Sequence, residues 1–219
     1  GKPKILDTAA LAAAVQHRAP LYDKLQEGHF NLISALHKSL RGSDVDAALY
    51  WLARMLDGGE DPHYIARRLV RFASEDVGLA DPQALGMALA AWDSYDRLGS
   101  PEGELALAQC VIYLATAPKS NAAYVAEKAS MQAARKSGSL MPPKHMLNAP
   151  TRLMKDLGHG AGYEYDHHTE EGFSGQDYFP EGMRRCRFYI PGDRGFEREI
   201  SKRLAYWDKL RSAREQDAK

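Results

Sequence analysis

The chain has 219 residues, of which 44% are hydrophobic and 26% charged, values close to ordinary globular usage that exclude a disordered or collagen-like chain. Lys and Arg together number 29, and so do Asp and Glu. No overall charge therefore draws the chain to nucleic acid or to an anionic membrane, and any such contact must be local.

Cysteine usage and hydropathy predict the class of protein. Cys110 and Cys186 lack the spacing of a disulfide or metal framework, which favours reduced thiols in a cytoplasmic protein. No apolar run reaches the roughly 18 residues of a membrane span, and no signal-peptide pattern opens the chain. Because Gly1-Lys2-Pro3 begins the sequence without Met, we interpret it as a piece of a longer polypeptide.

The first 41 residues predict two helices joined by a polar connector. We expect a short helix over 8–16, the connector over 16–27 and a helix over 29–40. Lys38 and Arg41 lie near the end of the second helix, where basic side chains suit the helix dipole.

From 43 to 137 the pattern predicts helix after helix. Asp61-Pro62, Asp81-Pro82 and Ser100-Pro101 each place an oxygen-bearing cap before a proline that can begin a helix. Glycines close the preceding helices, so the connections are short and the neighbours antiparallel. The expected fold class is all-α, with helical hairpins forming a collar-like layer.

Apolar spacing identifies the expected core. Residues at one-face spacing are Leu49, Leu52, Met55 and Leu56, followed by Ile65, Leu69 and Phe72. The segment 100–117 is apolar on more than one side and should lie at the centre. Ser120 should cap an alanine-rich helix over 121–136, which Gly138 ends.

Beyond Leu140 regular structure should become sparse. A short helix is expected over 151–157, and then an irregular segment over 158–195 with brief strands near 163–165 and 187–190. A final helix should run from 193 or 195 to about 214. One face of it carries Phe196, Ile200, Leu204, Trp207 and Leu210.

The sequence shows no catalytic constellation. A P-loop for ATP is absent. Asp166-His167-His168 with Glu170 and Glu171 is the densest group of metal-ligand types, but adjacent side chains seldom converge on one ion, which favours an exposed polar loop. Glu75-Asp76 is interpreted as a helix end, with Glu75 four residues after Arg71 and able to pair with it. We predict no catalytic, cofactor or metal site in this chain.

Three basic groups are candidates for DNA or phosphate contact. Arg67, Arg68 and Arg71 fall on one side of a helix, although a solvated charged face would use the same residues. Arg184, Arg185 and Arg187 form a second group with the same alternative. In Lys119-Ser120-Asn121 a helix N-terminus beside a lysine could take an anion, whereas a plain cap is the simpler interpretation.

Specific strings of the sequence carry more information than its periodicity, and they include residues 29–39, 41–44, 46–55, 65–69, 74–82, 117–121 and 148–151. These strings closely resemble the C-terminal half of the replication-associated recombination protein A family, bacterial relatives of the Werner-helicase-interacting ATPases. They follow in the family's order, and the resemblance extends from about residue 8 nearly to the end.

The resemblance implies a clamp-loader-like collar that holds a homotetramer together. It also implies an N-terminal AAA+ domain in the parent, with Walker motifs, ATP and Mg, and a DNA-stimulated ATPase that acts at replication forks in the cytoplasm, at the nucleoid. Single-stranded-DNA-binding protein would be a partner, and DNA forks or single-stranded DNA would be bound by the parent. Residues up to about Arg18 would be the tail of the AAA+ lid.

The expected organisation has three parts. Residues 1–27 would be the end of the lid and a linker, 28–138 the helical oligomerisation body, and 139–219 an irregular wrapped segment plus the C-terminal helix. We therefore predict an oligomerisation and partner-docking region, with the Ser74–Pro82 turn and the Lys119–Asn121 corner as shared surfaces. Alternatives are a DNA-binding module that uses the Arg67, Arg68 and Arg71 face, and an independent small-molecule enzyme, which would require a deep pocket with converging polar groups.

Overall fold

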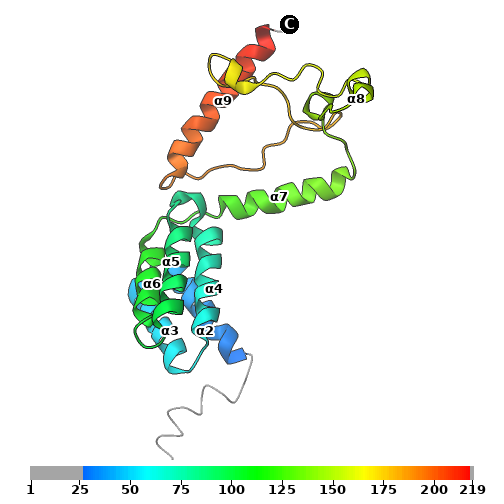
Figure 1. Cartoon of the computed structure of the whole chain (residues 1–219). Coiled ribbons are helices and arrows are strands. Elements are labelled where there is room, and N and C mark those ends of the chain that lie inside the picture. Colours follow the sequence, from blue (N-terminus) through cyan, green and yellow to red (C-terminus); the bar gives the residue numbers. More distant parts are fainter. Residues whose placement is uncertain (1–26, 218–219) are drawn as a thin grey trace, which may run out of the picture. The chain divides into compact units, whose positions relative to one another are not determined.

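The computed structural model describes residues 27–217, which fall into two compact units that divide between Asn121 and Ala122. The expected helix over 8–16, the lid tail and nearly all of the 16–27 connector lie outside the described residues. Within the described part every regular element is a helix (Figure 1). This confirms the all-α prediction. None of these helices is both long enough and apolar enough to cross a bilayer.

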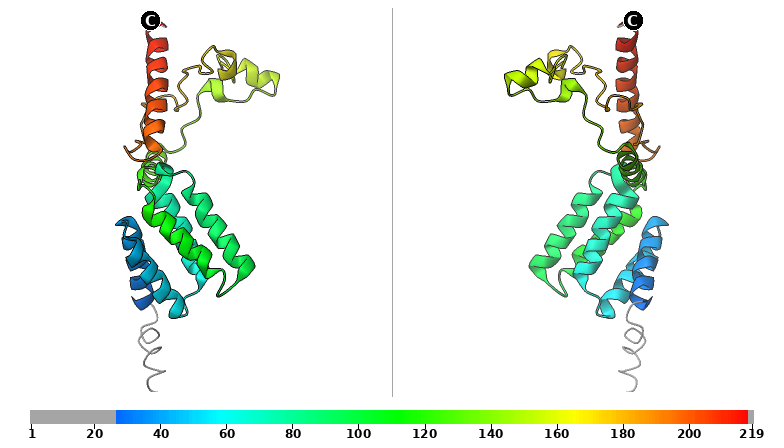
Figure 2. Two further views of the ribbon diagram at one scale, coloured as in Figure 1. Left: turned by 90° about the vertical axis from the view of Figure 1, so that its left-hand side faces the viewer. Right: turned by 90° about the vertical axis from the view of Figure 1, so that its right-hand side faces the viewer.

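The first unit is a bundle of five α-helices, seen side by side in Figures 1 and 2. They are α2 (Glu27–Arg41), α3 (Val45–Asp57), α4 (Pro62–Phe72), α5 (Ala84–Leu98) and α6 (Glu104–Thr116). Helix α6 packs against all four of the others, as its apolar sequence predicted. Between α4 and α5 the chain forms a π-helix, η1 (Ala73–Val77), and a 3-10 turn, η2 (Gly78–Ala80).

The core of the bundle contains most of the residues that the periodicity indicated. Leu52, Met55, Ile65, Leu69 and Phe72 are all buried, whereas Leu49 and Leu56 are only partly so. The middle of α6 contributes a further buried set, which comprises Leu107, Cys110, Val111, Leu114 and Ala115. The burial of these side chains is the main stabilising contribution to the bundle.

Of the three prolines that were expected to begin a helix, only Pro62 does so. Asp61 caps α4 by accepting a hydrogen bond from the His63 amide, and Pro62 is the first helical residue. Asp81-Pro82, in contrast, lies in a turn ahead of α5, because the Asp81 carboxylate accepts bonds from the Gln83 amide and, 2.6 Å away, from the Tyr113 hydroxyl of α6.

Ser100-Pro101 also precedes its helix without starting it. Helix α6 begins at Glu104, and the Ser100 hydroxyl donates to the Glu104 carboxylate across the intervening turn. Asp81-Pro82 and Ser100-Pro101 fail to start their helices for the same reason. A short polar side chain ahead of a proline can bond to a neighbouring turn or helix as readily as it caps.

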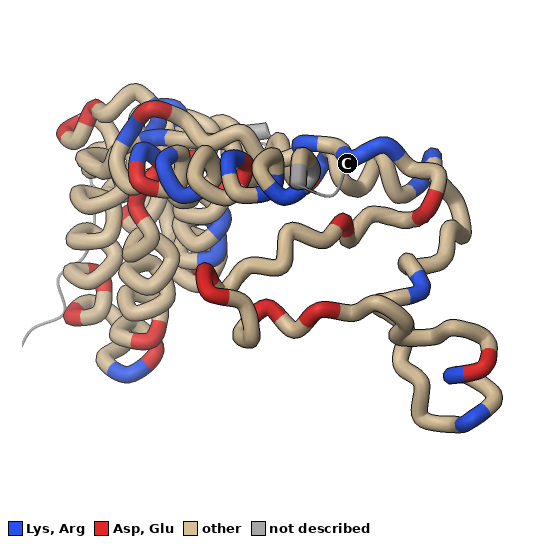
Figure 3. Tube along the Cα trace, turned by 90° about the horizontal axis from the view of Figure 1, so that it is seen from above, with Lys and Arg blue, Asp and Glu red and all other residues tan. Residues whose placement is uncertain are grey.

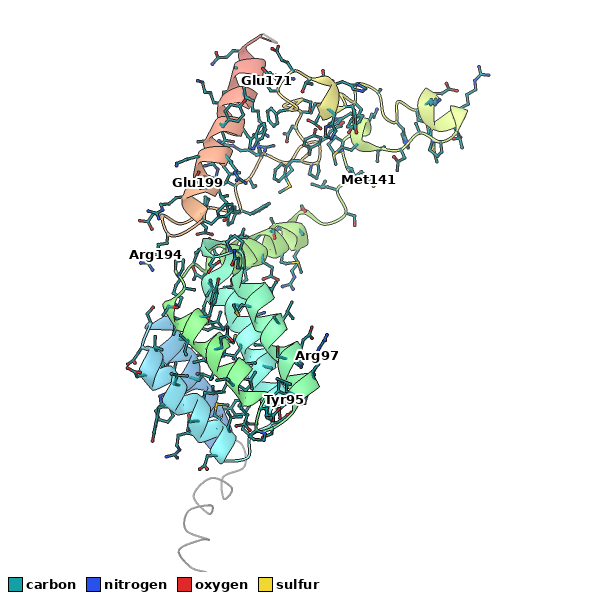
Figure 4. The ribbon with its side chains drawn as sticks, turned by 60° about the vertical axis from the view of Figure 1, so that its left-hand side comes forward. Tyr95, Arg97, Met141, Glu171, Arg194 and Glu199 are labelled. Carbon is teal, nitrogen blue, oxygen red and sulfur yellow. The ribbon has the colours of Figure 1, made fainter. Side chains whose placement is uncertain are left out.

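Gly103 should tolerate no side chain. A Cβ there would lie 2.8 Å from the Tyr95 Cα and the Gly99 carbonyl oxygen, both of them backbone atoms (Tyr95 is labelled in Figure 4). We expect Gly103→Ala to lower the free energy of unfolding by about 1–2 kcal/mol, measured by urea denaturation. Gly86→Ala is the control, because Gly86 is exposed in the first turn of α5 and its Cβ would meet nothing within 4 Å. It should stabilise by about 0.5–1 kcal/mol; a loss at Gly86, or none at Gly103, would contradict this account.

The second unit contains α7 (Ala122–Ser137), α8 (Arg152–Asp156) and α9 (Glu197–Asp217), with 3-10 turns η3 (Lys144–Met146) and η4 (Asp166–His168). The unit begins with α7, whereas the sequence suggested a division after residue 138. No residue of α7 is buried.

The brief strands expected near 163–165 and 187–190 are absent from the described residues. The backbone near residue 163 forms hydrogen bonds with a side chain instead of with a neighbouring strand. The Glu164 backbone amide donates to the Gln176 side-chain oxygen, and the Gln176 side-chain nitrogen donates to the Gly162 carbonyl at 2.7 Å. The aromatic side chains of this segment form ring contacts, such as Phe179 with Phe188 at 6.1 Å between centroids.

The C-terminal helix is held by a residue that its apolar face did not indicate. Glu197, in the first turn of α9, is fully buried. Its carboxylate accepts from the Tyr189 hydroxyl at 2.8 Å and from the Gly192 amide at 2.7 Å. The predicted apolar face is only half-buried, with Ile200, Leu204, Trp207 and Leu210 all partly accessible.

Candidate functional site

Three of the strings that carry the family resemblance meet at one corner of the first unit. They are the last residue of α2 with the turn after it (41–43), the π-helix η1 with its following turn, and the 117–121 segment after α6. The Ser120 amide donates to the Asp76 carbonyl oxygen at 2.8 Å, which joins the second string to the third. The two surfaces proposed from sequence, the Ser74–Pro82 turn and the Lys119–Asn121 corner, are therefore one continuous site.

Asp76 is the centre of this corner. Its side chain is 11% exposed and receives both the Nε and a terminal nitrogen of Arg41, at 2.6 and 3.1 Å. A π-helix accommodates an extra residue per turn and is often found at functional sites. Here the wider turn directs Asp76 toward α2 while Glu75, its neighbour, pairs with Arg71 at 2.6 Å on the exposed side of α4. The predicted Arg71–Glu75 pair is confirmed.

Lys119 performs a different task from the anion contact considered from sequence. Its Nζ donates to the carbonyl oxygens of Ala115 and Ala117 at 2.9 and 2.6 Å, and lies 3.3 Å from the Ser43 Oγ. These carbonyls belong to the C-terminal end of α6, where cations are favourable. Burial lowers the pKa of Lys119, and the nearby Asp76 carboxylate opposes that shift. Lys119 thus ties α6 to the α2–α3 turn. Asn121 is exposed and directly precedes α7.

His37 lies beneath the corner, packed edge-on against the Phe72 ring at 5.4 Å. Burial, with the positive charge of Arg68 as the next contribution, lowers its pKa to about 4. Its Nε2 and the Nε of Arg68 are both buried without a hydrogen-bond partner. The corner therefore contains a neutral histidine at physiological pH, enclosed by charged groups.

The three α4 arginines do not form one exposed face. Arg67 is exposed and stacks over the Tyr64 ring at 5.2 Å, and Arg71 is engaged with Glu75. Arg68 is half-buried beside His37. Sequence spacing placed them on one side of the helix, but the packing of α4 against α2 separates Arg68 from the other two.

The second arginine group belongs to the second unit. Arg185 pairs with Asp177 at 3.2 Å and Arg187 pairs with Asp208 of α9, while Arg184 is exposed. Because Asp208 also lies 3.4 Å from Arg211, the segment 184–187 is brought beside an α9 arginine that sequence analysis did not select. The segment 184–187 and Arg211 are at least 24 positions apart, so no local spacing could have indicated that they lie side by side.

The metal-ligand cluster considered from sequence begins at Asp166, in the second unit. In residues 27–217 no group of three His, Cys, Asp or Glu side chains is arranged to hold a metal ion. Asp166, the first residue of the suspected cluster, accepts from the Ser174 amide at 2.7 Å and the Tyr178 hydroxyl at 3.2 Å, and these bonds, that of Ser174 first, lower its pKa. It organises a loop.

Comparison with known proteins gives two family matches. Residues 42–208 match the model described as MgsA AAA+ ATPase C terminal, and residues 1–41 match AAA C-terminal domain. The boundary between the matches falls at Arg41 and Gly42, between α2 and α3, so the corner joins residues from both.

Individual relatives agree with these matches. The chain is 55% identical to replication-associated recombination protein A of Coxiella burnetii over 86% of this chain, and 47% identical to that of Escherichia coli K12 over 93%. It is 42% identical to ATPase WRNIP1 of Dictyostelium discoideum over 84% of this chain. It covers 43%, 46% and 21% of those relatives, so it spans less than half of each.

Proposed function

Because the chain belongs to the MgsA AAA+ ATPase C-terminal family, we propose that it is the oligomerisation and partner-docking region of a DNA-dependent AAA+ ATPase that maintains replication forks. The observation that carries this proposal is a set of large apolar side chains left exposed on two adjacent helices. They comprise Leu85 and Leu89 of α5 with Leu105 and Ile112 of α6.

These side chains follow helical spacing. Leu85 and Leu89 are four residues apart on α5, and Leu105 and Ile112 are seven apart on α6, so each pair lies along one face of its helix. Helices α5 and α6 pack against each other. Exposed apolar residues that recur on one face are typical of a protein interface. A second copy of this chain would cover them.

Helix α7 supports the same proposal. It has 16 residues and none is buried, although an isolated helix of this length is only marginally stable in water. Half of its residues are alanine or serine, which permits close approach of another helix.

Light scattering tests the proposal. The 219-residue chain should have a mass near 97 kDa, four times the 24.3 kDa of one chain, over several protein concentrations and at two salt levels. Leu89→Glu should shift the mass toward the monomer, because it places a charge on the exposed α5 face. Ala90→Glu is the matched control, since Ala90 is also exposed but lies about 100° around the helix. A monomeric wild type, or equal dissociation by both variants, would refute the proposal.

We extend the proposal to the complete protein on the basis of the family. It would bind ATP and Mg in an ATPase domain outside this chain and hydrolyse ATP when stimulated by DNA. It would contact single-stranded-DNA-binding protein, bind forks or single-stranded DNA, and act in the cytoplasm at the nucleoid. The corner at Asp76, which unites residues of both matched families, is the proposed place where the collar meets the rest of that protein.

A further inference from the structure

A groove of about 760 Å³ lies in the second unit, between residues 185–189 and the middle of α9. Its walls include four half-buried aromatic side chains, Phe173, Phe188, Tyr189 and Trp207. The Phe173 and Trp207 ring centroids are 5.1 Å apart. The volume falls within the range of about 300–1,000 Å³ that is usual for sites of small-ligand size.

The groove is positively charged. Arg185, which pairs with Asp177 outside the lining, and Arg187 and Arg211 line the groove together with one carboxylate, Asp208. Arg187 and Arg211 share that one carboxylate. The Arg211 guanidinium lies over the Phe173 ring at 5.1 Å, and its Nε is buried without a hydrogen-bond partner. An anion entering the groove would therefore meet more arginines than carboxylates, and in Arg211 a guanidinium whose hydrogen bonds within the protein are incomplete. Figure 3 marks the Lys and Arg residues of α9 in blue.

The groove is also held in shape before any ligand arrives. Glu197 accepts hydrogen bonds from the Tyr189 hydroxyl and the Gly192 amide, which fixes the 185–192 segment to the first turn of α9. Arg214 donates to the Ser174 carbonyl at 2.8 Å and thereby fixes the loop that carries Phe173 to the end of α9. A site whose walls are fixed loses less conformational entropy on binding.

We propose that this groove binds single-stranded nucleic acid. The phosphates are neutralised by Arg185, Arg187 and Arg211, and a base stacks on the Trp207 and Phe173 rings. Arginines interleaved with aromatic rings are the usual elements of such sites, because every base offers a flat π-face and every nucleotide a negative charge. An acidic peptide would satisfy the arginines but has few flat groups to cover four rings.

This site rests on the DNA contact proposed for the complete protein, which it locates in this chain, but it does not depend on the assembly proposal. It uses only residues of the second unit, whereas the proposed self-association surface lies on α5 and α6 of the first. It also places nucleic-acid contact away from Arg67 and Arg71, so that Arg67→Glu should leave the affinity unchanged.

Binding of an oligothymidylate of about 15 nucleotides to the 219-residue chain, followed by fluorescence anisotropy, tests the proposal. Trp207→Ala should weaken binding about tenfold with an unchanged salt dependence, because stacking is lost and charge is kept. Arg185→Gln should weaken binding and reduce the slope of log affinity against log salt by about 0.7. Tyr206→Ala is the matched control: Tyr206 is the neighbouring ring on α9, 49% exposed, and does not line the groove.

Cys186 supplies a second readout that needs no substitution. It lines the groove and is exposed, whereas Cys110, the other cysteine of the chain, is fully buried, and burial raises the pKa of that thiol to about 12. Alkylation should therefore label Cys186 selectively, and the oligothymidylate should slow that labelling. Equal protection by inorganic polyphosphate or polyglutamate of matched charge, or equal loss of affinity in Tyr206→Ala and Trp207→Ala, would overturn the proposal. Trp207→Phe should retain binding, which separates loss of stacking from loss of folding.

Discussion

The Asp76→Ala variant should lose about 3 kcal/mol of free energy of unfolding in the first unit. Two charge-assisted hydrogen bonds from Arg41 disappear, each worth roughly 1.5–3 kcal/mol where the groups are shielded from water. Arg41 is 52% exposed and regains hydration, so the upper values do not apply. Lys119 is half-buried and loses its nearest favourable carboxylate, which adds to the cost.

Urea denaturation in a Trp207→Phe background measures this loss, because Trp51 and Trp92 then report the first unit alone. Glu75→Gln is the control on the same π-helix. Its pair with Arg71 joins adjacent helical turns at an exposed site, and should contribute no more than about 0.5 kcal/mol. If the two variants were equally stable, Asp76 would not be the centre of the corner.

Acid should destabilise the first unit through His37. Burial holds its pKa near 4 in the folded protein, below the ordinary value of 6.5 that applies to the unfolded chain. The unfolded state therefore binds the proton first as the pH falls. The contribution of the neutral ring to stability is intact above about pH 6.5, declines between 6.5 and 4, and is lost below 4. The expected loss from pH 7 to pH 5 is roughly 2 kcal/mol.

Replacing His37 by Gln should remove this part of the pH dependence, as measured by urea denaturation at pH 7 and pH 5 and constant protein concentration. His63→Gln is the control. Hydrogen bonds to Asp61 and Asp96 raise the pKa of the exposed His63, so its contribution is present at low pH and disappears as the pH rises through that raised value. His63→Gln removes a contribution of the opposite sign, so its loss of stability from pH 7 to pH 5 should be at least as large as that of the wild type. Parallel pH profiles for wild type and His37→Gln would show that another group is responsible.

The two effects concern one location. Asp76 connects α2, the π-helix and the segment after α6, and His37 lies directly beneath it. A substitution of Asp76 or His37 should destabilise the end of the bundle where residues of both matched families meet. Loss of stability at this corner can therefore be compared with loss of assembly in the Leu89→Glu variant, which alters an exposed face and should leave stability nearly unchanged.

The sequence by itself determined the helices and much of the core. Apolar residues at three- and four-residue spacing identify the buried faces of α3 and α4, and Asp61-Pro62 identifies the start of α4, because both signals are local consequences of helix geometry. The family was also readable from strings such as residues 74–82 and 117–121, and the matched models confirm it. The Arg71–Glu75 pair was predictable because its partners are four residues apart.

Only the tertiary structure decided which polar residues meet. Asp76 and Arg41 are 35 positions apart and Tyr113 and Asp81 are 32 apart, so their pairing depends on how the helices pack. Packing likewise separated Arg68 from Arg67, assigned Lys119 to the end of α6, buried Glu197, and brought Arg187 beside Asp208. Helix periodicity is a property of neighbouring residues, whereas the burial and the electrostatic partners of a charge depend on segments that are distant in sequence.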